Sequence, residues 1–150
     1  MKLRLIFILS LALLAFSCSK DKADYIPSIK SDPYKIYKEG LNAFKKNQFF
    51  FASKKFTEAE TNFTSPEAAA KSSIMSAFSL YAISFYQEAE DNLNRYIKIY
   101  PADKNIMYAH YLLAIISYEQ IGEEKHDLKP LLDAKKKIDF FLKTYPNSEY

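Results

Sequence analysis

The sequence predicts an all-α solenoid of about three helical hairpins, preceded by a secretory signal and a short linker. Three observations predict this fold class. The 150 residues include only two glycines but 24 Tyr and Phe residues, which favours helices with short connections over strands joined by tight turns. Small residues recur twelve positions apart. The dipeptide Tyr-Pro closes two apolar helical segments, at 100–101 and at 145–146.

The N-terminal segment has the layout of a secretory signal. Lys2 and Arg4 precede a nearly unbroken apolar run at 5–16. This run is too short to span a bilayer, which needs roughly 20 apolar residues, and it has the length of a signal-peptide core. We therefore expect residues 1–17 to be a signal peptide.

The single cysteine, Cys18, follows the small residue Ser17 directly. This arrangement resembles a bacterial lipoprotein signal, in which the cysteine is lipidated and becomes the first residue of the mature protein. Ser19 after the cysteine is compatible with the outer membrane. We expect a lipid anchor on the periplasmic face of that membrane. The alternative is an ordinary signal peptide with an incidental cysteine.

The charge balance excludes strong nucleic-acid binding. Without residues 1–17 the chain keeps 19 basic and 18 acidic side chains, which gives no strong field for phosphates. Residues 18–31 then form a polar tether with one proline. Asp32 and Pro33 are suited to begin the first helix, since Asp is a good N-cap and Pro fits the first turn.

Small residues mark where the two helices of each hairpin touch. Gly40 and Ala52 form the first such pair and Ala77 and Ala89 the second, while Ala134 lies twelve residues before Pro146. This pattern resembles the tetratricopeptide repeat, a helix-turn-helix unit of about 34 residues. We expect an array over 32–150, with repeats at 33–65, 66–102 and 103–146 and the start of a further helix at 147–150.

The third repeat is longer than the other two by about eight residues, and the excess falls at 122–130. Gly122 is expected to end the first helix of this repeat as a left-handed C-cap. The charged residues 123–127 then form an exposed loop.

Aromatic residues dominate the face that such an array turns toward a ligand. Positions 2, 5, 9 and 12 of each repeat line this face, and here most of them are aromatic or aliphatic, with Lys71 as the exception. We expect a groove for apolar or aromatic peptide side chains, with tyrosine hydroxyls for backbone groups. The alternative is that these rings are ordinary core. The expected groove residues are Tyr34, Tyr37, Leu41, Phe44, Ile74, Phe78, Tyr81, Tyr108, Tyr111, Ile115 and Tyr118.

The sequence offers no pattern for catalysis or for a cofactor. His110 and His126 are 16 residues apart and lack the neighbours of a metal site. There is no Gly-rich phosphate loop and no nucleophile elbow. We expect no catalytic residues, no metal and no cofactor, so the chain is predicted not to be an enzyme.

Two stretches resemble the BamD (ComL) family of outer-membrane assembly lipoproteins. They are Asn-Ile-Met-Tyr at 105–108, and Tyr-Pro-Asn-Ser-Glu-Tyr at 145–150. The family carries Pro-Asn-Ile-x-Tyr and Tyr-Pro-Asn-Ser-x-Tyr in the same order, with a longer loop in its third repeat. The resemblance implies a non-enzymatic scaffold of the β-barrel assembly (BAM) machinery.

The resemblance also implies partners. The N-terminal repeats would receive the C-terminal signals of unfolded barrel proteins, and later repeats would dock a BamA-like barrel subunit and other assembly lipoproteins. The family has about five repeats, so we expect these residues to be an N-terminal portion, with Asn147 or Ser148 as the next N-cap. The alternatives are another periplasmic tetratricopeptide lipoprotein that supports pilus secretin assembly, or a subunit that activates a cell-wall hydrolase.

Overall fold

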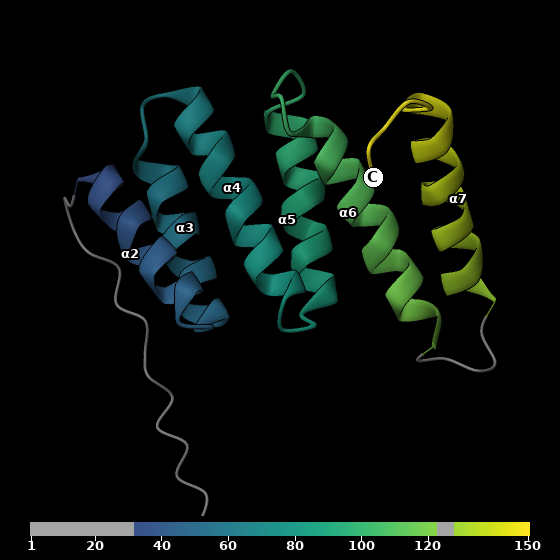
Figure 1. The fold of residues 1–150 in the computed structure, drawn as a ribbon, viewed down its shortest axis with the longest axis horizontal. Coiled ribbons are helices and arrows are strands. Elements are labelled where there is room, and N and C mark those ends of the chain that lie inside the picture. Colours follow the sequence, from purple (N-terminus) through teal and green to yellow (C-terminus); the bar gives the residue numbers. More distant parts are fainter. Residues whose placement is uncertain (1–31, 123–127) are drawn as a thin grey trace, which may run out of the picture.

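The computed structural model describes residues 32–122 and 128–150, and these form an array of six α-helices. In chain order they are α2 (Pro33–Lys45), α3 (Phe49–Asn62), α4 (Pro66–Tyr81), α5 (Tyr86–Ile99), α6 (Ile106–Glu119) and α7 (Lys129–Thr144). Figure 1 shows them in a row, each beside the next. The predicted all-α repeat fold is confirmed. The predictions for the signal peptide, Cys18, the tether, the loop 123–127 and His126 lie outside the described residues.

Capping residues set the starts of the first helices of hairpins one and two. Asp32 caps α2 by accepting a hydrogen bond from the backbone N–H of Tyr34 at 3.0 Å. Ser65 Oγ accepts from the N–H of Ala68 at the start of α4, at 3.4 Å. A proline follows each cap in the first turn, where no hydrogen bond from its nitrogen is needed. The start of α2 at Asp32 and Pro33 was predicted from the sequence, whereas the cap at Ser65 was not.

Small residues let the paired helices approach closely. A Cβ added to Gly40 would lie 2.9 Å from the ring of Phe56, which is fully buried. Ala52, Ala77, Ala89 and Ala134 are likewise completely buried, as their twelve-residue spacing predicted.

Serines extend this close packing along α4, a feature that the sequence reading did not single out. Ser72, Ser73, Ser76 and Ser79 are all fully buried. Ser72 and Ser79 donate to backbone carbonyls one turn earlier in α4, while Ser76 donates across to the carbonyl of Ser53 on α3 at 3.1 Å. Because each hydroxyl has a partner, α4 buries polar atoms without a large desolvation cost.

The first two hairpins share one tight turn, and the third does not. Asn47 and Ser84 stand at equivalent places with φ of 58° and 59°, and the next residue in each turn donates back to the preceding helix. In the third hairpin, α6 is followed instead by a 3₁₀ turn at Gln120–Gly122. At the end of α6, the N–H of Gln120 donates to the carbonyls of Ile116 and Tyr118. The left-handed cap expected at Gly122 stays a prediction.

The segment after α7 turns back toward α6 (Figure 1). Residues 147–150 are not helical, in contrast to the expected start of a further helix. The ring of Tyr150 stacks on that of Tyr111, with centroids 4.8 Å apart, and also contacts Tyr108. These ring contacts hold the segment against the array.

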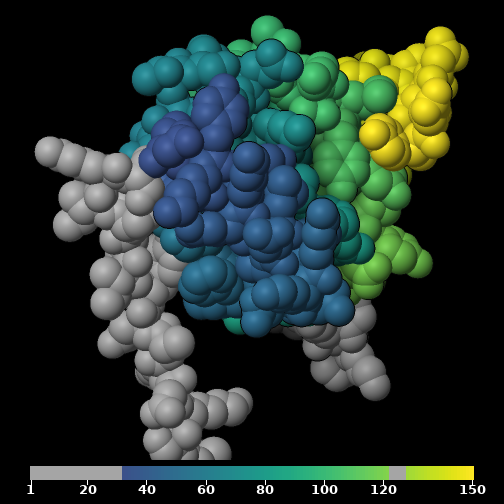
Figure 2. Space-filling model, turned by 60° about the vertical axis from the view of Figure 1, so that its left-hand side comes forward, coloured from purple at the N-terminus to yellow at the C-terminus, as the bar shows by residue number. Residues whose placement is uncertain are grey.

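Figure 2 views the array with α2 and α3 at the front, and α7 projects beyond them at the far end. None of the helices in the described ranges is long and apolar enough to cross a membrane.

Candidate functional site

Aromatic side chains from α2, α4 and α6 contact one another in a series, which we call the aromatic face. At its N-terminal end, Tyr34 meets Phe63 edge-on with centroids 4.9 Å apart. Tyr37 packs against the buried ring of Phe56 at 5.3 Å. Leu41 is half-buried beside the same cluster. The rings of the first hairpin are therefore partly packed into the core and partly exposed at the surface.

Phe44 and Phe78 join the first hairpin to the second across this face. Their centroids lie 5.8 Å apart, and Phe78 continues to Tyr81 at 6.1 Å. Ile74 lies deeper and belongs to the buried core. The middle of the aromatic face is therefore held by α2 and α4 together.

The C-terminal end of the aromatic face is built on α6. Tyr108 and Tyr111 contact each other at 6.2 Å, and Tyr111 also packs on Phe141 of α7 at 5.8 Å. Ile115 is half-buried, whereas Tyr118 is 61% exposed at the end of α6.

A pocket of about 580 Å³ opens in the middle of this face. We call it the central pocket. It brings together four of the predicted groove residues, Phe44, Ile74, Phe78 and Tyr108, with Lys71 at the same site. Tyr34, Tyr37, Leu41, Tyr81, Tyr111, Ile115 and Tyr118 do not line it. Four lining residues were not predicted: Met75, Lys104, Asn105 and Tyr150.

A hydrogen-bonded turn positions two of these unpredicted residues. The carboxylate of Asp103 accepts from the backbone N–H and from the side-chain amide of Asn105, both at 2.9 Å. The hydroxyl of Tyr96 donates to the same carboxylate. Burial alone would raise the pKa of Asp103, but these hydrogen bonds outweigh it and lower the pKa. The turn therefore stays anchored at neutral pH, with Lys104 and Asn105 beside the pocket.

Tyr37, Tyr81 and Tyr108 of the aromatic face remain protonated at neutral pH. Burial raises the pKa of Tyr108 to about 12, and it also raises the pKa of Tyr37 and of Tyr81. Their hydroxyls are therefore hydrogen-bond donors as well as acceptors. Such groups suit the backbone of an extended peptide.

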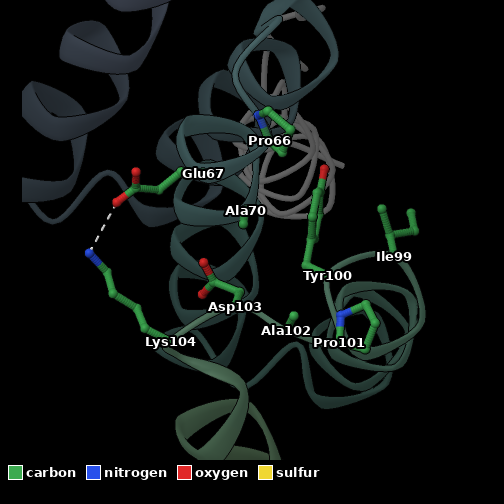
Figure 3. A pocket seen from close by; sticks show the side chains of 9 residues that line it. All are labelled: Pro66, Glu67, Ala70, Ile99, Tyr100, Pro101, Ala102, Asp103 and Lys104. Atoms are coloured by element: carbon green, nitrogen blue, oxygen red, sulfur yellow. Dashed lines mark hydrogen bonds and ion pairs between the residues drawn. The ribbon is translucent and has the colours of Figure 1, made fainter.

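A second pocket of about 480 Å³ lies where the turn after α5 meets the start of α4 (Figure 3). Its lining is largely apolar, including Pro66, Ala70 and Tyr100. Lys104 Nζ pairs with Glu67 Oε1 at 3.2 Å on one side of it. Lys104 therefore borders both pockets.

The described histidine, His110, lies near two aromatic rings. His110 on α6 is 5.0 Å from Phe140 and 5.9 Å from Tyr145, between centroids, and burial lowers its pKa. Within 32–122 and 128–150, no three His, Cys, Asp or Glu side chains gather in a way that could hold a metal ion.

Two comparisons with known proteins bear on this site. A family model described as outer membrane lipoprotein (YfiO) matches residues 30–150. The outer membrane protein assembly factor BamD of Rickettsia prowazekii (strain Madrid E) is 28% identical over 145 residues, which covers 97% of this chain and 56% of the relative. The BamD protein of Caulobacter vibrioides (strain ATCC 19089 / CIP 103742 / CB 15) is 29% identical over 115 residues, covering 77% of this chain and 38% of the relative.

The chain therefore spans about half the length of the curated relatives it matches. The resemblance drawn from residues 105–108 and 145–150 is confirmed, and so is the predicted association with the outer membrane. Because the family model matches most of its residues, the chain belongs to the outer membrane lipoprotein (YfiO) family.

Proposed function

We propose that this chain is a non-enzymatic, lipid-anchored scaffold in the assembly of outer-membrane β-barrel proteins. Its aromatic face receives C-terminal segments of unfolded barrel proteins, which are extended strands that end in an aromatic residue. The names of both relatives support a role in outer membrane protein assembly over a role in pilus secretin assembly or hydrolase activation.

The central pocket is the observation that carries this proposal. Phe44, Phe78 and Tyr108 line it with ring faces and edges from three different helices. A ring inserted there gains apolar burial together with aromatic contacts, each worth about 0.5–1.5 kcal/mol beyond burial. The pocket volume of about 580 Å³ is ample for one aromatic side chain with part of its neighbours.

The rest of the aromatic face suits an extended segment. Rings continue from the pocket to Tyr81 through Phe78, and to Tyr111 through Tyr108. Protonated tyrosine hydroxyls offer hydrogen bonds to peptide groups that an extended strand leaves unpaired.

The anchor and the partners complete the proposal. Cys18 carries the lipid, and the tether holds the array near the periplasmic surface of the outer membrane. A BamA-like barrel subunit and other assembly lipoproteins are the expected protein partners. The substitution Cys18→Ser should release the protein from the membrane fraction, and a variant that stays membrane-bound and lipidated would overturn the anchor.

A peptide titration tests the groove. The purified chain in mild detergent is titrated with a fluorescent peptide that copies the last strand of an outer-membrane barrel, and with the same peptide lacking its terminal aromatic residue. Loss of that residue should weaken binding at least about tenfold, because burying an aromatic side chain contributes about 1.5–3 kcal/mol.

Two variants locate the binding. Phe78→Leu, which removes a ring from the central pocket, should weaken binding of the full peptide several-fold. The matched control, Phe50→Leu, removes an exposed ring from α3, outside both the central pocket and the aromatic face, and should leave affinity unchanged. Failure of both peptides to bind, by a chain with native helical content, would reject the proposed function.

A further inference from the structure

The central pocket carries positive charge without acidic side chains. Lys71 and Lys104 are its charged lining residues, and its lining contains no Asp or Glu. Three further pockets on the described helices each contain two carboxylates: Glu67 with Asp103 in the pocket of Figure 3, and Glu90 with Asp133 in two pockets between α5, α6 and α7. Among these four pockets, the lining of the central pocket is the best suited to a negatively charged group.

Both lysines are available to such a group. Lys71 is exposed, and its ammonium lies 5.7 Å from the centre of the Tyr37 ring. Lys104 pairs with Glu67 at 3.2 Å, but these side chains are 72% and 75% exposed. An ion pair so open to water contributes roughly 0–1 kcal/mol, so a ligand can compete for this lysine at little cost.

The pocket thus combines ring contacts and positive charge within one small volume. The last residue of an aromatic-ended peptide presents both complementary groups together, a ring and a free α-carboxylate. An internal aromatic residue presents the ring without the charge. A peptide that ends in an aromatic residue therefore matches the whole lining, and an internal strand matches only half of it.

We propose that the central pocket recognises the free C-terminal carboxylate of its peptide, with Lys71 and Lys104 as the counter-charges and Asn105 as a neutral donor. This inference rests on the proposed function. The terminal ring enters between Phe44, Phe78 and Tyr108 while the carboxylate stays at the lysine side of the pocket. The pocket therefore selects the C-terminal end of a peptide, since neither the aromatic ring nor the carboxylate alone contacts the whole lining.

The experiment compares one barrel-derived peptide in two forms, with a free C-terminal acid and with a C-terminal amide. Binding to the purified chain in mild detergent is measured by fluorescence anisotropy at low and at moderate salt. The amide should bind about fivefold more weakly, as expected for two partly exposed charge contacts. Added salt should weaken binding of the acid and leave the amide almost unchanged.

Variants then assign the effect to the lysines. Lys71→Gln with Lys104→Gln should reduce affinity for the acid to that for the amide, and should not change affinity for the amide. The matched control is Lys98→Gln with Lys143→Gln, which removes the same charge from exposed positions outside the pocket. All four positions are exposed, so neither double variant should unfold the chain.

The outcomes separate the two proposals. Equal binding of acid and amide, or an unchanged preference in the Lys71 and Lys104 double variant, overturns the carboxylate site and leaves the aromatic groove standing. Loss of the preference in the control variant as well means that only the overall charge matters, which also overturns the site. Absence of binding by either peptide rejects the groove and the carboxylate site together.

Discussion

The first two hairpins and the third are built from the same kind of unit, yet they are packed very differently. Nine of the 16 residues of α4 are buried. Only Ala134 and Phe141 are buried among the 16 residues of α7. Helix α4 lies between neighbours on both sides, whereas α7 leaves Leu132 and Leu142 exposed at the far end of the array.

The hydrogen bonds and ion pairs between helices also differ between the first two hairpins and the third. Arg95 on α5 donates both guanidinium nitrogens to Glu60 on α3, at 2.6 Å and 2.7 Å, and Tyr100 adds a third hydrogen bond to this carboxylate at 3.1 Å. In the third hairpin, Lys137 reaches Glu90 through a single ammonium contact at 2.6 Å. A planar guanidinium holds a carboxylate in a fixed geometry through two parallel hydrogen bonds, whereas an ammonium acts as a point charge that fixes the geometry less. The burial of a helix in this array and its polar contacts therefore depend on how many neighbouring helices pack against it.

Removing one aromatic ring from each region should give the largest difference in stability loss between the first and third hairpins. Phe56→Ala should lower the free energy of unfolding by about 3–5 kcal/mol, because the ring is fully buried against Gly40 and Tyr37. Phe140→Ala on α7 should cost about 1 kcal/mol or less, because that ring is 48% exposed. Urea denaturation followed by circular dichroism measures both, and equal losses would remove the contrast between the two regions.

The ion pair is expected to have the next largest effect. Arg95→Ala should lower stability by about 3 kcal/mol, since it leaves the Glu60 side chain, which is 4% exposed, without its counter-charge. Lys135→Ala breaks an exposed pair with Asp139 on α7 and should cost less than about 0.5 kcal/mol. If Arg95→Ala lowers the free energy of unfolding only slightly, and adding Glu60→Gln does not change that loss, the ion pair contributes little to stability.

Gly40→Ala tests close packing within the first hairpin. In an open helix this change would stabilise by up to about 1 kcal/mol through helix propensity. Here the new Cβ meets the Phe56 ring at 2.9 Å, so we expect a net loss of about 1–2 kcal/mol from overpacking. Asn42→Ala, on the exposed side of α2, is the control and should be neutral or slightly stabilising. A gain in stability for Gly40→Ala would show that the ring can move aside.

Acidification should weaken the third hairpin selectively, with the smallest effect of the four. Burial lowers the pKa of His110, so the unfolded chain binds a proton near pH 6.5 before the folded chain does. Stability contributed by neutral His110 is therefore present above this pH and is lost as pH falls below it. The imidazole lies near Glu90, Asp133, Lys136 and Lys137.

Hydrogen exchange of α6 and α7 amides at pH 7 and pH 5, corrected for intrinsic rates, measures this loss. His110→Gln should reduce the difference between the two pH values, whereas amides of α3 and α4 should change little. An equal loss of protection in all helices would mean that the effect comes from groups outside the third hairpin.

Local chemistry in the sequence was enough to predict the helices. Asp32 with Pro33, and Pro66 at the start of α4, mark helix starts through their own backbone properties. The twelve-residue spacing of small residues correctly identified where helices touch, since that spacing depends only on helix geometry and a short turn.

The sequence by itself therefore determined the hairpins, their order and the aromatic character of one face. Only the tertiary structure decided that Lys104, Asn105 and Tyr150 share a pocket with Phe44, and that Arg95 pairs with Glu60. These groups come from separate elements, and each occupies its place because the neighbouring helices pack at particular distances. Periodicity shows which way a side chain points along its own helix, whereas a pocket depends on the packing between helices.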